Sequence, residues 1–76
     1  MVFEKVREVI SGQLGIAEEK IKMTTSFTDD LGADSLDIFQ VVSELEEIFD
    51  IEFSNEDAEK IKVIADAVKY IEDRLE

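Results

Sequence analysis

The chain contains no cysteine, so 76 residues have to hold a fold together by packing alone, without a disulfide or a cysteine-bound metal. Hydrophobic residues make up 45% of the sequence and charged residues 37%, a balance typical of globular domains. No internal repeat, low-complexity tract or linker divides the sequence, and it contains no proline. We therefore expect a single domain over residues 1–76, stabilised as a compact bundle of helices.

Helical spacing of apolar residues is the main structural signal, and it predicts an all-α fold with three main helices and a short third helix between the last two. The helices are expected at about residues 3–14, 35–49, 56–61 and 63–74, with a long loop between the first and second. Asp34 or Ser35 suits the N-cap of the second helix, and Asp37 places negative charge in its first turn. No alternation of apolar and polar residues is long enough to predict a sheet.

The second helix has a wide apolar stripe, which is expected to face the core. It consists of Ile38, Val42, Leu45 and Phe49, and it is widened by Phe39, Val41 and Ile48. The long loop before this helix is expected to be pinned to the core by Ile16, Ile21, Phe27 and Leu31. A loop of this length is unusual in so small a domain and often has a function.

Negative charge is concentrated in the middle of the chain. Residues 23–59 hold 12 of the 20 acidic residues and none of the 8 basic ones, whereas the other residues are balanced, so the whole net charge of -12 lies in this segment. Such a surface repels nucleic acid and anionic membranes, and it attracts basic protein surfaces. No apolar run approaches the roughly 20 residues of a membrane span, so the sequence predicts a soluble, cytoplasmic protein without membrane insertion.

Several kinds of catalysis are excluded by residues that the chain lacks. Without histidine or cysteine there is no Ser-His triad, no thiol nucleophile and no ordinary transition-metal site. Glycine motifs that bind phosphate are absent, and the residues around Gly32 do not match a calcium loop. We therefore predict no catalytic residue and no metal site.

One segment with a chemical use remains, and it reads DLGADSLD from Asp30 to Asp37. A turn that contains Gly32 would present the hydroxyl of Ser35 at the start of a helix. A phosphate ester there would meet unpaired backbone N–H groups and the positive end of the helix dipole. From these residues alone, an ordinary helix cap is the simpler interpretation.

The same segment closely resembles the phosphopantetheine attachment motif of acyl carrier proteins of type II (dissociated) fatty acid synthesis. The similarity continues before the motif in residues 27–31, and after it in residues 45–53, 56–61 and 70–71. It covers nearly the whole chain, which is therefore identified as a member of that family. The resemblance implies an acyl-carrier-like four-helix bundle that is not an enzyme and that carries growing fatty acyl chains as thioesters.

The resemblance also implies a covalent cofactor, 4'-phosphopantetheine, which a separate phosphopantetheinyl transferase moves from coenzyme A to Ser35, between Asp34 and Leu36. Because the sequence has no cysteine, the thiol that carries the acyl group has to come from this cofactor. The implied partners are acyl chains and fatty acid synthesis enzymes with basic docking patches. The carrier itself is expected to be a monomer.

Two further sets of residues are implied by the resemblance. The partner-binding face of the second helix is expected to comprise Leu36, Asp37, Gln40, Ser43, Glu44, Glu46 and Glu47. The acyl pocket is expected to be lined by Phe27, Ile38, Val42, Leu45, Phe53, Ala58, Ile61 and Ala67, and to stay small until it is loaded. Three positions depart from the family pattern, namely Gln40, Ser43 and Ser54, of which the last is commonly proline.

Two alternatives to fatty acid synthesis stay open. The chain could serve as the carrier of a polyketide or another specialised pathway, or it could be an unmodified acidic protein-interaction module of the same fold. The acidic middle segment and the residues Asp34 to Asp37 favour a fatty acid carrier. Loading by a phosphopantetheinyl transferase would separate any carrier from the unmodified module.

Overall fold

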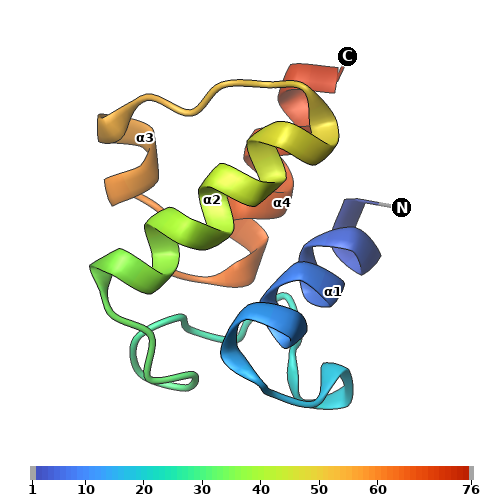
Figure 1. Cartoon of the computed structure of the whole chain (residues 1–76), viewed down its shortest axis with the longest axis vertical. Helices are drawn as coiled ribbons and strands as arrows, with labels where there is room; N and C mark the ends of the chain where they lie inside the picture. The colour runs from blue at the N-terminus through green and yellow to red at the C-terminus, as the bar shows by residue number, and fades with distance from the viewer. Residues whose placement is uncertain (1, 76) are drawn as a thin grey trace.

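The computed structural model describes residues 2–75, which form helices joined by loops (Figure 1). In chain order the helices are α1 (Val2–Leu14), the 3₁₀ helix η1 (Glu18–Lys20), α2 (Ser35–Phe49), α3 (Asn55–Glu59) and α4 (Ile64–Leu75). The predicted all-α fold is confirmed, and pairing of extended backbone within the described residues is limited to an isolated bridge. Residues 1 and 76 of the expected domain lie outside the described range.

α2 begins and ends at the predicted residues, and its ends explain why. The carboxylate of Asp34 accepts a hydrogen bond from the N–H of Asp37 at 2.9 Å, and the Asp37 carboxylate accepts one from the N–H of Asp34 at 3.3 Å. This reciprocal capping box satisfies two backbone donors at the helix start. The helix stops at Asp50, which adopts a left-handed φ of 55°. α3 is shorter than the expected helical turn and ends at Glu59.

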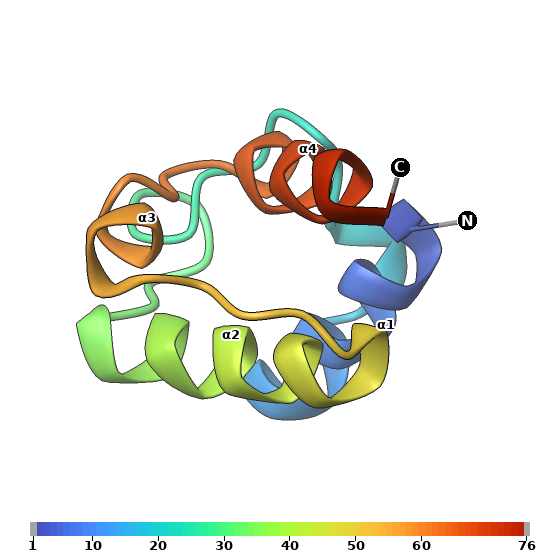
Figure 2. The ribbon, with the colours of Figure 1, turned by 90° about the horizontal axis from the view of Figure 1, so that it is seen from above.

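Figure 2 shows how the helices are arranged around the core. α2 and α4 lie on opposite sides of the bundle, and α1 packs against both of them. α3 lies at one end of the bundle, while the start of α1 and the end of α4 lie at the other. The segment of residues 50–54 runs back along α2 to reach α3 (Figure 2).

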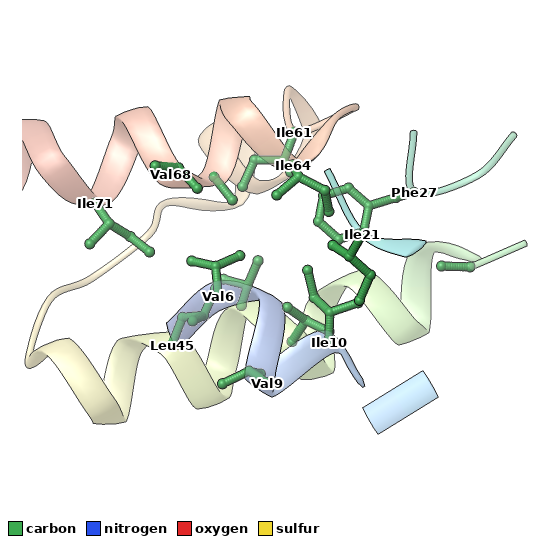
Figure 3. Close-up of a cluster of buried hydrophobic side chains, with 14 residues drawn as sticks. Val6, Val9, Ile10, Ile21, Phe27, Leu45, Ile61, Ile64, Val68 and Ile71 are labelled. Carbon is green, nitrogen blue, oxygen red and sulfur yellow. The ribbon is translucent and has the colours of Figure 1, made fainter. Parts of the chain in front are cut away.

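The core consists of apolar side chains from α1, α2, α4 and the long loop (Figure 3). Its largest fully buried members are Val6, Ile10, Ile21, Phe27, Val41, Leu45, Ile64, Val68 and Ile71. Removing a side chain of this size from water stabilises the fold by roughly 1.5–3 kcal/mol. The prediction that Ile21 and Phe27 pin the loop to the core is confirmed, because both are buried.

The long loop is also tied to the residues just before α4. An antiparallel bridge pairs Ser26 with Val63. In it, the N–H of Phe27 donates to the carbonyl of Lys62, and the N–H of Ile64 donates to the carbonyl of Thr25, both at 3.0 Å. This bridge was not predicted, because a single pair of residues leaves no alternating pattern in the sequence. It fixes the loop that leads to Ser35 against the opposite side of the bundle.

The apolar stripe of α2 is narrower than predicted. Val41, Val42 and Leu45 are buried, as expected, and Ile38 and Phe49 are partly buried against the core. The prediction was wrong for two other side chains of this helix. Phe39 is 41% exposed and Ile48 is 42% exposed. The reason is that α2 packs against α1 and α3, which leaves the edges of a stripe this wide without a cover.

Candidate functional site

Ser35 is the first residue of α2, and its side chain is exposed. The loop turns toward it at Gly32, whose φ of 67° is disfavoured for residues with a side chain. The next residue, Ala33, is buried, and its N–H donates to the carbonyl of Phe27 at 2.8 Å. A glycine turn and a buried alanine therefore hold the start of α2 in place and leave the serine hydroxyl in solvent.

The backbone around Ser35 fits a phosphate group. The capping box uses the N–H of Asp37, whereas the N–H groups of Ser35 and Leu36 have no hydrogen-bond partner within residues 2–75. Such donors, together with the helix dipole, favour an anion at this end of α2. The carboxylates of Asp34 and Asp37 oppose it by repulsion, although each accepts a backbone N–H. The site therefore fits a singly charged phosphodiester better than a multiply charged phosphate.

A cavity of about 130 Å³ opens beside Ser35. It is lined by Ser35, Ile38, Phe39, Ala58, Glu59 and Ile61, which come from α2, α3 and the turn that follows α3. Most of the side chains that line the cavity are apolar, and the cavity extends to Ser35. It is large enough to receive a short apolar segment.

Three of the eight residues expected around an acyl chain line this cavity, namely Ile38, Ala58 and Ile61. Four others are buried in the core instead: Phe27, Val42, Leu45 and Ala67. The ring of Phe53 stacks on that of Tyr70, with centroids 4.2 Å apart. The sequence reasoning missed Phe39 and Glu59. The spacing held a signal for Phe39, because residues four apart share a face of a helix and Phe39 follows Ser35 by four.

α3 is held to α4 by a cluster of polar side chains, which we call the Tyr70 clasp and define as Asp57, Tyr70 and Arg74. The hydroxyl of Tyr70 donates to the Asp57 carboxylate at 2.9 Å. Arg74 donates to the same hydroxyl at 2.7 Å and lies 3.9 Å from the carboxylate. The guanidinium of Arg74 also lies over the Tyr70 ring, 4.7 Å from its centroid. The clasp thus fixes one wall of the cavity beside Ser35.

The clasp changes the acidity of two of its members. The hydrogen bond from Tyr70, followed by one involving Ser54, lowers the pKa of Asp57 below its ordinary value of 3.8. Burial, followed by the hydrogen bond to Asp57, raises the pKa of Tyr70 above its ordinary value of 10.0. Both shifts favour a charged Asp57 and a neutral Tyr70, which is the pairing that the hydrogen bond requires.

The expected partner-binding residues of α2 do not all present their side chains in the same way. Leu36 is 65% exposed, and Gln40, Ser43, Glu44 and Glu47 are exposed as well. Asp37 is half-buried and takes part in the capping box. Glu46 is half-buried, and its carboxylate accepts the backbone N–H of Phe53 at 2.7 Å. Glu46 therefore holds the segment before α3 to α2.

Two other kinds of site find no counterpart in the part of the chain that the structure describes. Among residues 2–75, the helices lack the length and apolar character needed to cross a bilayer. The same residues contain no group of three or more acidic side chains arranged to hold a metal ion. The surroundings of Ser35 are therefore the candidate site that the geometry favours.

Comparison with known proteins gives a consistent result. The family model described as the phosphopantetheine attachment site matches residues 4–71. The acyl carrier protein of Clostridium acetobutylicum is 55% identical over 76 residues, which are 100% of this chain and 99% of that protein. Two solved structures are similar in fold and sequence. A chain of Mycobacterium tuberculosis assigned as an acyl carrier protein gives a TM-score of 0.90 at 34% identity, covering 97% of this chain and 99% of that one. The acyl carrier protein of Enterococcus faecalis, described for its high thermal stability, gives 0.78 at 41% identity, covering 92% and 89%.

Proposed function

This chain belongs to the family of acyl carrier proteins with a phosphopantetheine attachment site, and we propose that Ser35 is the residue that carries the phosphopantetheine. Members of the family are carriers rather than enzymes, and they bring acyl chains to the enzymes of fatty acid synthesis. The cofactor is a covalent 4'-phosphopantetheine, which supplies the thiol that the sequence lacks. Action in the cytoplasm stays a prediction.

The state of the Ser35 hydroxyl is the observation that carries this proposal. The hydroxyls of Ser26 and Ser54 accept the backbone N–H groups of Asp29 and Asp57, each at 3.1 Å. The Ser35 hydroxyl has no partner among the described residues and stands in solvent at the start of α2. It is therefore free to react, whereas modification of Ser26 or Ser54 would remove a hydrogen bond that shapes the backbone. The remaining serines, Ser11 and Ser43, lie inside helices and not beside the free N–H groups of a helix start.

The attachment reaction uses Ser35 as a nucleophile. Its Oγ attacks the pantetheine-side phosphorus of the coenzyme A pyrophosphate, and a new P–O bond forms as the bond to the nucleotide part breaks. The hydroxyl proton goes to a base of the transferase, since neither Asp34 nor Asp37 is hydrogen-bonded to the Ser35 hydroxyl and each accepts a backbone N–H of the capping box instead. The N–H groups of Ser35 and Leu36 then lie beside the phosphodiester and orient it.

We propose that partner enzymes bind the exposed face of α2. The residues concerned are Leu36, Asp37, Gln40, Ser43, Glu44, Glu46 and Glu47. An exposed pair between one of these carboxylates and a basic side chain contributes only about 0–1 kcal/mol. Such pairs steer and orient a partner and allow it to leave, which suits a carrier that visits several enzymes. The carboxylate of Glu46 already accepts the backbone N–H of Phe53. Glu46 therefore adds negative charge to this face but is not free to reorient toward a partner.

We further propose that the cavity beside Ser35 receives the start of the acyl chain. Its volume of about 130 Å³ supports a space that has to enlarge before a long chain fits. Of the elements that line the cavity, α3 buries the least apolar surface, because Ala58 is its buried residue. Enlargement would therefore begin with α3 and release the core residues Phe27, Val42, Leu45 and Ala67 to line the chain. Structures with and without a long acyl chain test this, and an equal cavity in both would contradict it.

The attachment site is tested by intact mass spectrometry after incubation with coenzyme A, magnesium and a phosphopantetheinyl transferase. We expect the wild-type chain to gain one phosphopantetheinyl unit and Ser35→Ala to gain none. Ser54→Ala is the matched control, because it removes a serine hydroxyl at another helix start and should still be loaded. Loading of Ser35→Ala, or failure to load the wild type, would overturn the assignment.

The pathway is tested with the loaded protein. We expect a β-ketoacyl synthase of fatty acid synthesis to extend an acyl chain carried on Ser35. Extension by a polyketide synthase, with none by the fatty acid enzyme, would move the chain to a specialised pathway and leave the attachment site unchanged.

A further inference from the structure

The lining of the cavity beside the attachment residue divides into a floor and a rim when its side chains are sorted by burial. The floor consists of apolar side chains that are buried or partly buried, namely Ile38, Ala58 and Ile61. The rim consists of the exposed residues of the lining, namely Ser35, Phe39 and Glu59. A group that enters the cavity from solvent has to pass this rim before it reaches the floor.

Of the three rim residues, Phe39 has the side chain that can cover an apolar floor. Ser35 is the attachment residue, and the carboxylate of Glu59 stays in solvent because burying a charge without a partner is costly. The ring of Phe39 is apolar, and it is 41% exposed although it lines the cavity. Phe39 follows Ser35 by four residues, so both lie on the same face of α2, one turn apart. The ring therefore stands at the mouth of the cavity, beside the residue from which a carried group extends.

The ring of Phe39 also has space on its other side, away from the cavity. Phe39 lines a second, shallow hollow of about 520 Å³, whose other lining residues are polar, namely Gln13, Gln40, Ser43, Glu44 and Glu47. Exposed side chains change rotamer in picoseconds to nanoseconds, so the ring can turn from the cavity toward this hollow. The apolar floor of the cavity offers the ring more apolar contact than the polar hollow does, which favours the position over the cavity.

We propose that Phe39 is the gate residue of this cavity. Its ring covers the first carbons of a carried, straight-chain acyl group and shields the thioester beside them, and its rotation toward the outer hollow uncovers that thioester. An acyl group that reaches the apolar floor is shielded, whereas an acetyl group, with a single methyl carbon to bury, is not. Phe39 thereby determines which carried groups are protected. The presence of an acyl group rests on the proposed function, whereas the position of the ring at the cavity mouth does not.

The chain offers a matched control for Phe39 on the same helix. Ile48 is 42% exposed, and it lines a different hollow, away from the cavity beside Ser35. Ile48→Ala therefore removes a large apolar side chain of equal exposure and leaves the cavity unchanged. Phe39→Tyr keeps the ring and adds a hydroxyl that solvent reaches at the rim. Phe39→Leu loses the ring but keeps apolar bulk, so it repeats the test of Phe39→Ala with a smaller loss of packing.

The first test uses the unloaded chain and finds the ring by NMR spectroscopy. Ala58 lies in α3 and Ile61 in the turn after it, so their methyl groups face the cavity from the side opposite α2. An aromatic ring displaces the proton resonances of groups that it lies over. We therefore expect these methyl signals to move in Phe39→Ala and Phe39→Leu, and to stay in place in Phe39→Tyr and Ile48→Ala. Unchanged signals in Phe39→Ala, or equal changes in Ile48→Ala, would overturn the position of the ring.

The second test uses chains that a phosphopantetheinyl transferase has loaded from butyryl or acetyl coenzyme A, and it measures cleavage of the thioester by hydroxylamine. We expect the butyryl thioester to be cleaved about threefold or more faster in Phe39→Ala than in the wild type, because the uncovered state becomes more populated. Phe39→Leu should change the rate in the same direction, and Phe39→Tyr and Ile48→Ala should match the wild type. The acetyl thioester should be cleaved within about twofold of the wild-type rate in every variant, since the ring does not cover it.

The outcomes separate the gate from the proposed function. Equal cleavage of the butyryl thioester in the wild type and Phe39→Ala would overturn the gate, and so would the same acceleration in Ile48→Ala or of the acetyl thioester. Failure of Ser35 to load in the wild type would overturn the proposed function, and with it the role of Phe39 toward an acyl group. The methyl signals of the unloaded chain would still decide whether the ring lies over the cavity.

Discussion

α3 and α4 follow one another in the chain, but they are held to the molecule by different forces. α4 buries Ile64, Ala67, Val68 and Ile71 in the core, whereas α3 buries only Ala58. α3 instead depends on the Tyr70 clasp and on the hydrogen bond between Glu46 and the backbone of Phe53. A helix held by polar contacts at the surface separates more easily than one held by buried side chains. The cavity beside Ser35 is therefore closed on one side by the helix that is least firmly attached.

The magnitudes support this difference. Each large side chain that α4 buries contributes roughly 1.5–3 kcal/mol, and removing it also leaves a cavity. A hydrogen bond of the kind found in the clasp contributes about 1 kcal/mol net. The loss of α3 is thus a local event, and the loss of α4 is the loss of the core. Four tests can measure the difference in how firmly α3 and α4 are held, or contradict it.

The largest effect is expected from Ile71→Ala in α4. Ile71 is fully buried, so its truncation removes apolar contact and leaves a space in the core. We expect the free energy of unfolding to fall by about 2–5 kcal/mol, measured by urea denaturation. Leu75→Ala in the same helix is the matched control, since Leu75 is 51% exposed, and its effect should stay below about 1 kcal/mol. A similar loss in both variants would contradict the view that burial holds α4.

A smaller effect is expected from Tyr70→Phe, which keeps the ring stacked on Phe53 and removes the hydroxyl of the clasp. We expect a loss of about 1 kcal/mol in the free energy of unfolding. Hydrogen exchange should quicken in α3 and stay unchanged in the centre of α4. Adding Asp57→Ala to Tyr70→Phe should cost less than the sum of the two single losses, because both remove the same hydrogen bond. Additive losses would show that the clasp does not act as a unit.

The clasp should also depend on pH. The lowered pKa of Asp57 means that its stabilising contribution is complete above the ordinary value of 3.8 and is lost as the pH falls through the folded-state value. The raised pKa of Tyr70 means that its contribution is complete below 10.0 and is lost as the pH rises through the folded-state value. We expect the stability difference between the wild type and Asp57→Asn to be constant near neutral pH and to shrink below about pH 4. A difference that stays the same at about pH 3 would exclude the ionised carboxylate as the basis of the clasp.

The contrast between the two helices also shows what the sequence could and could not predict. The bounds of α2 were predictable, because Asp34, Asp37 and the apolar stripe act within a few residues of one another. The exposure of Phe39 and Ile48 was not, because helical spacing shows which side chains share a face and not how much of that face another helix covers. The same limit applies to the Tyr70 clasp, in which Asp57 and Tyr70 are 13 residues apart and meet only in the folded chain.

The site follows the same pattern. Ser35 could be singled out from the sequence because its motif is local, and a resemblance over nearly the whole chain gave that motif its meaning. The acyl-pocket residues were harder to assign. Ile38, Ala58 and Ile61 line the cavity of this structure, whereas Leu45 and Ala67 are packed in the core. Core and pocket residues have the same chemistry, so only their positions in three dimensions distinguish them.

The smallest net effect is expected from a proline at Ser54, the residue that caps the start of α3. Ser54→Ala removes the hydroxyl that accepts the N–H of Asp57 at 3.1 Å, and we expect it to cost about 1 kcal/mol. Ser54→Pro loses the same cap, but the residue already has a φ of -75°, and its N–H donates no hydrogen bond within residues 2–75. Proline should therefore recover about 0.4–1 kcal/mol by restricting the unfolded chain.

The two Ser54 variants together show how α3 is held. We expect Ser54→Pro to lie within about 0.5 kcal/mol of the wild type in urea denaturation, and Ser54→Ala to lie below both. Hydrogen exchange in α3 should quicken in both variants, because each removes the cap from the folded state. An equal loss of stability in the two variants would mean that backbone restriction has no effect at this position. A gain in Ser54→Pro with unchanged exchange would mean that the cap contributes nothing, and that the Tyr70 clasp alone holds α3 over the cavity.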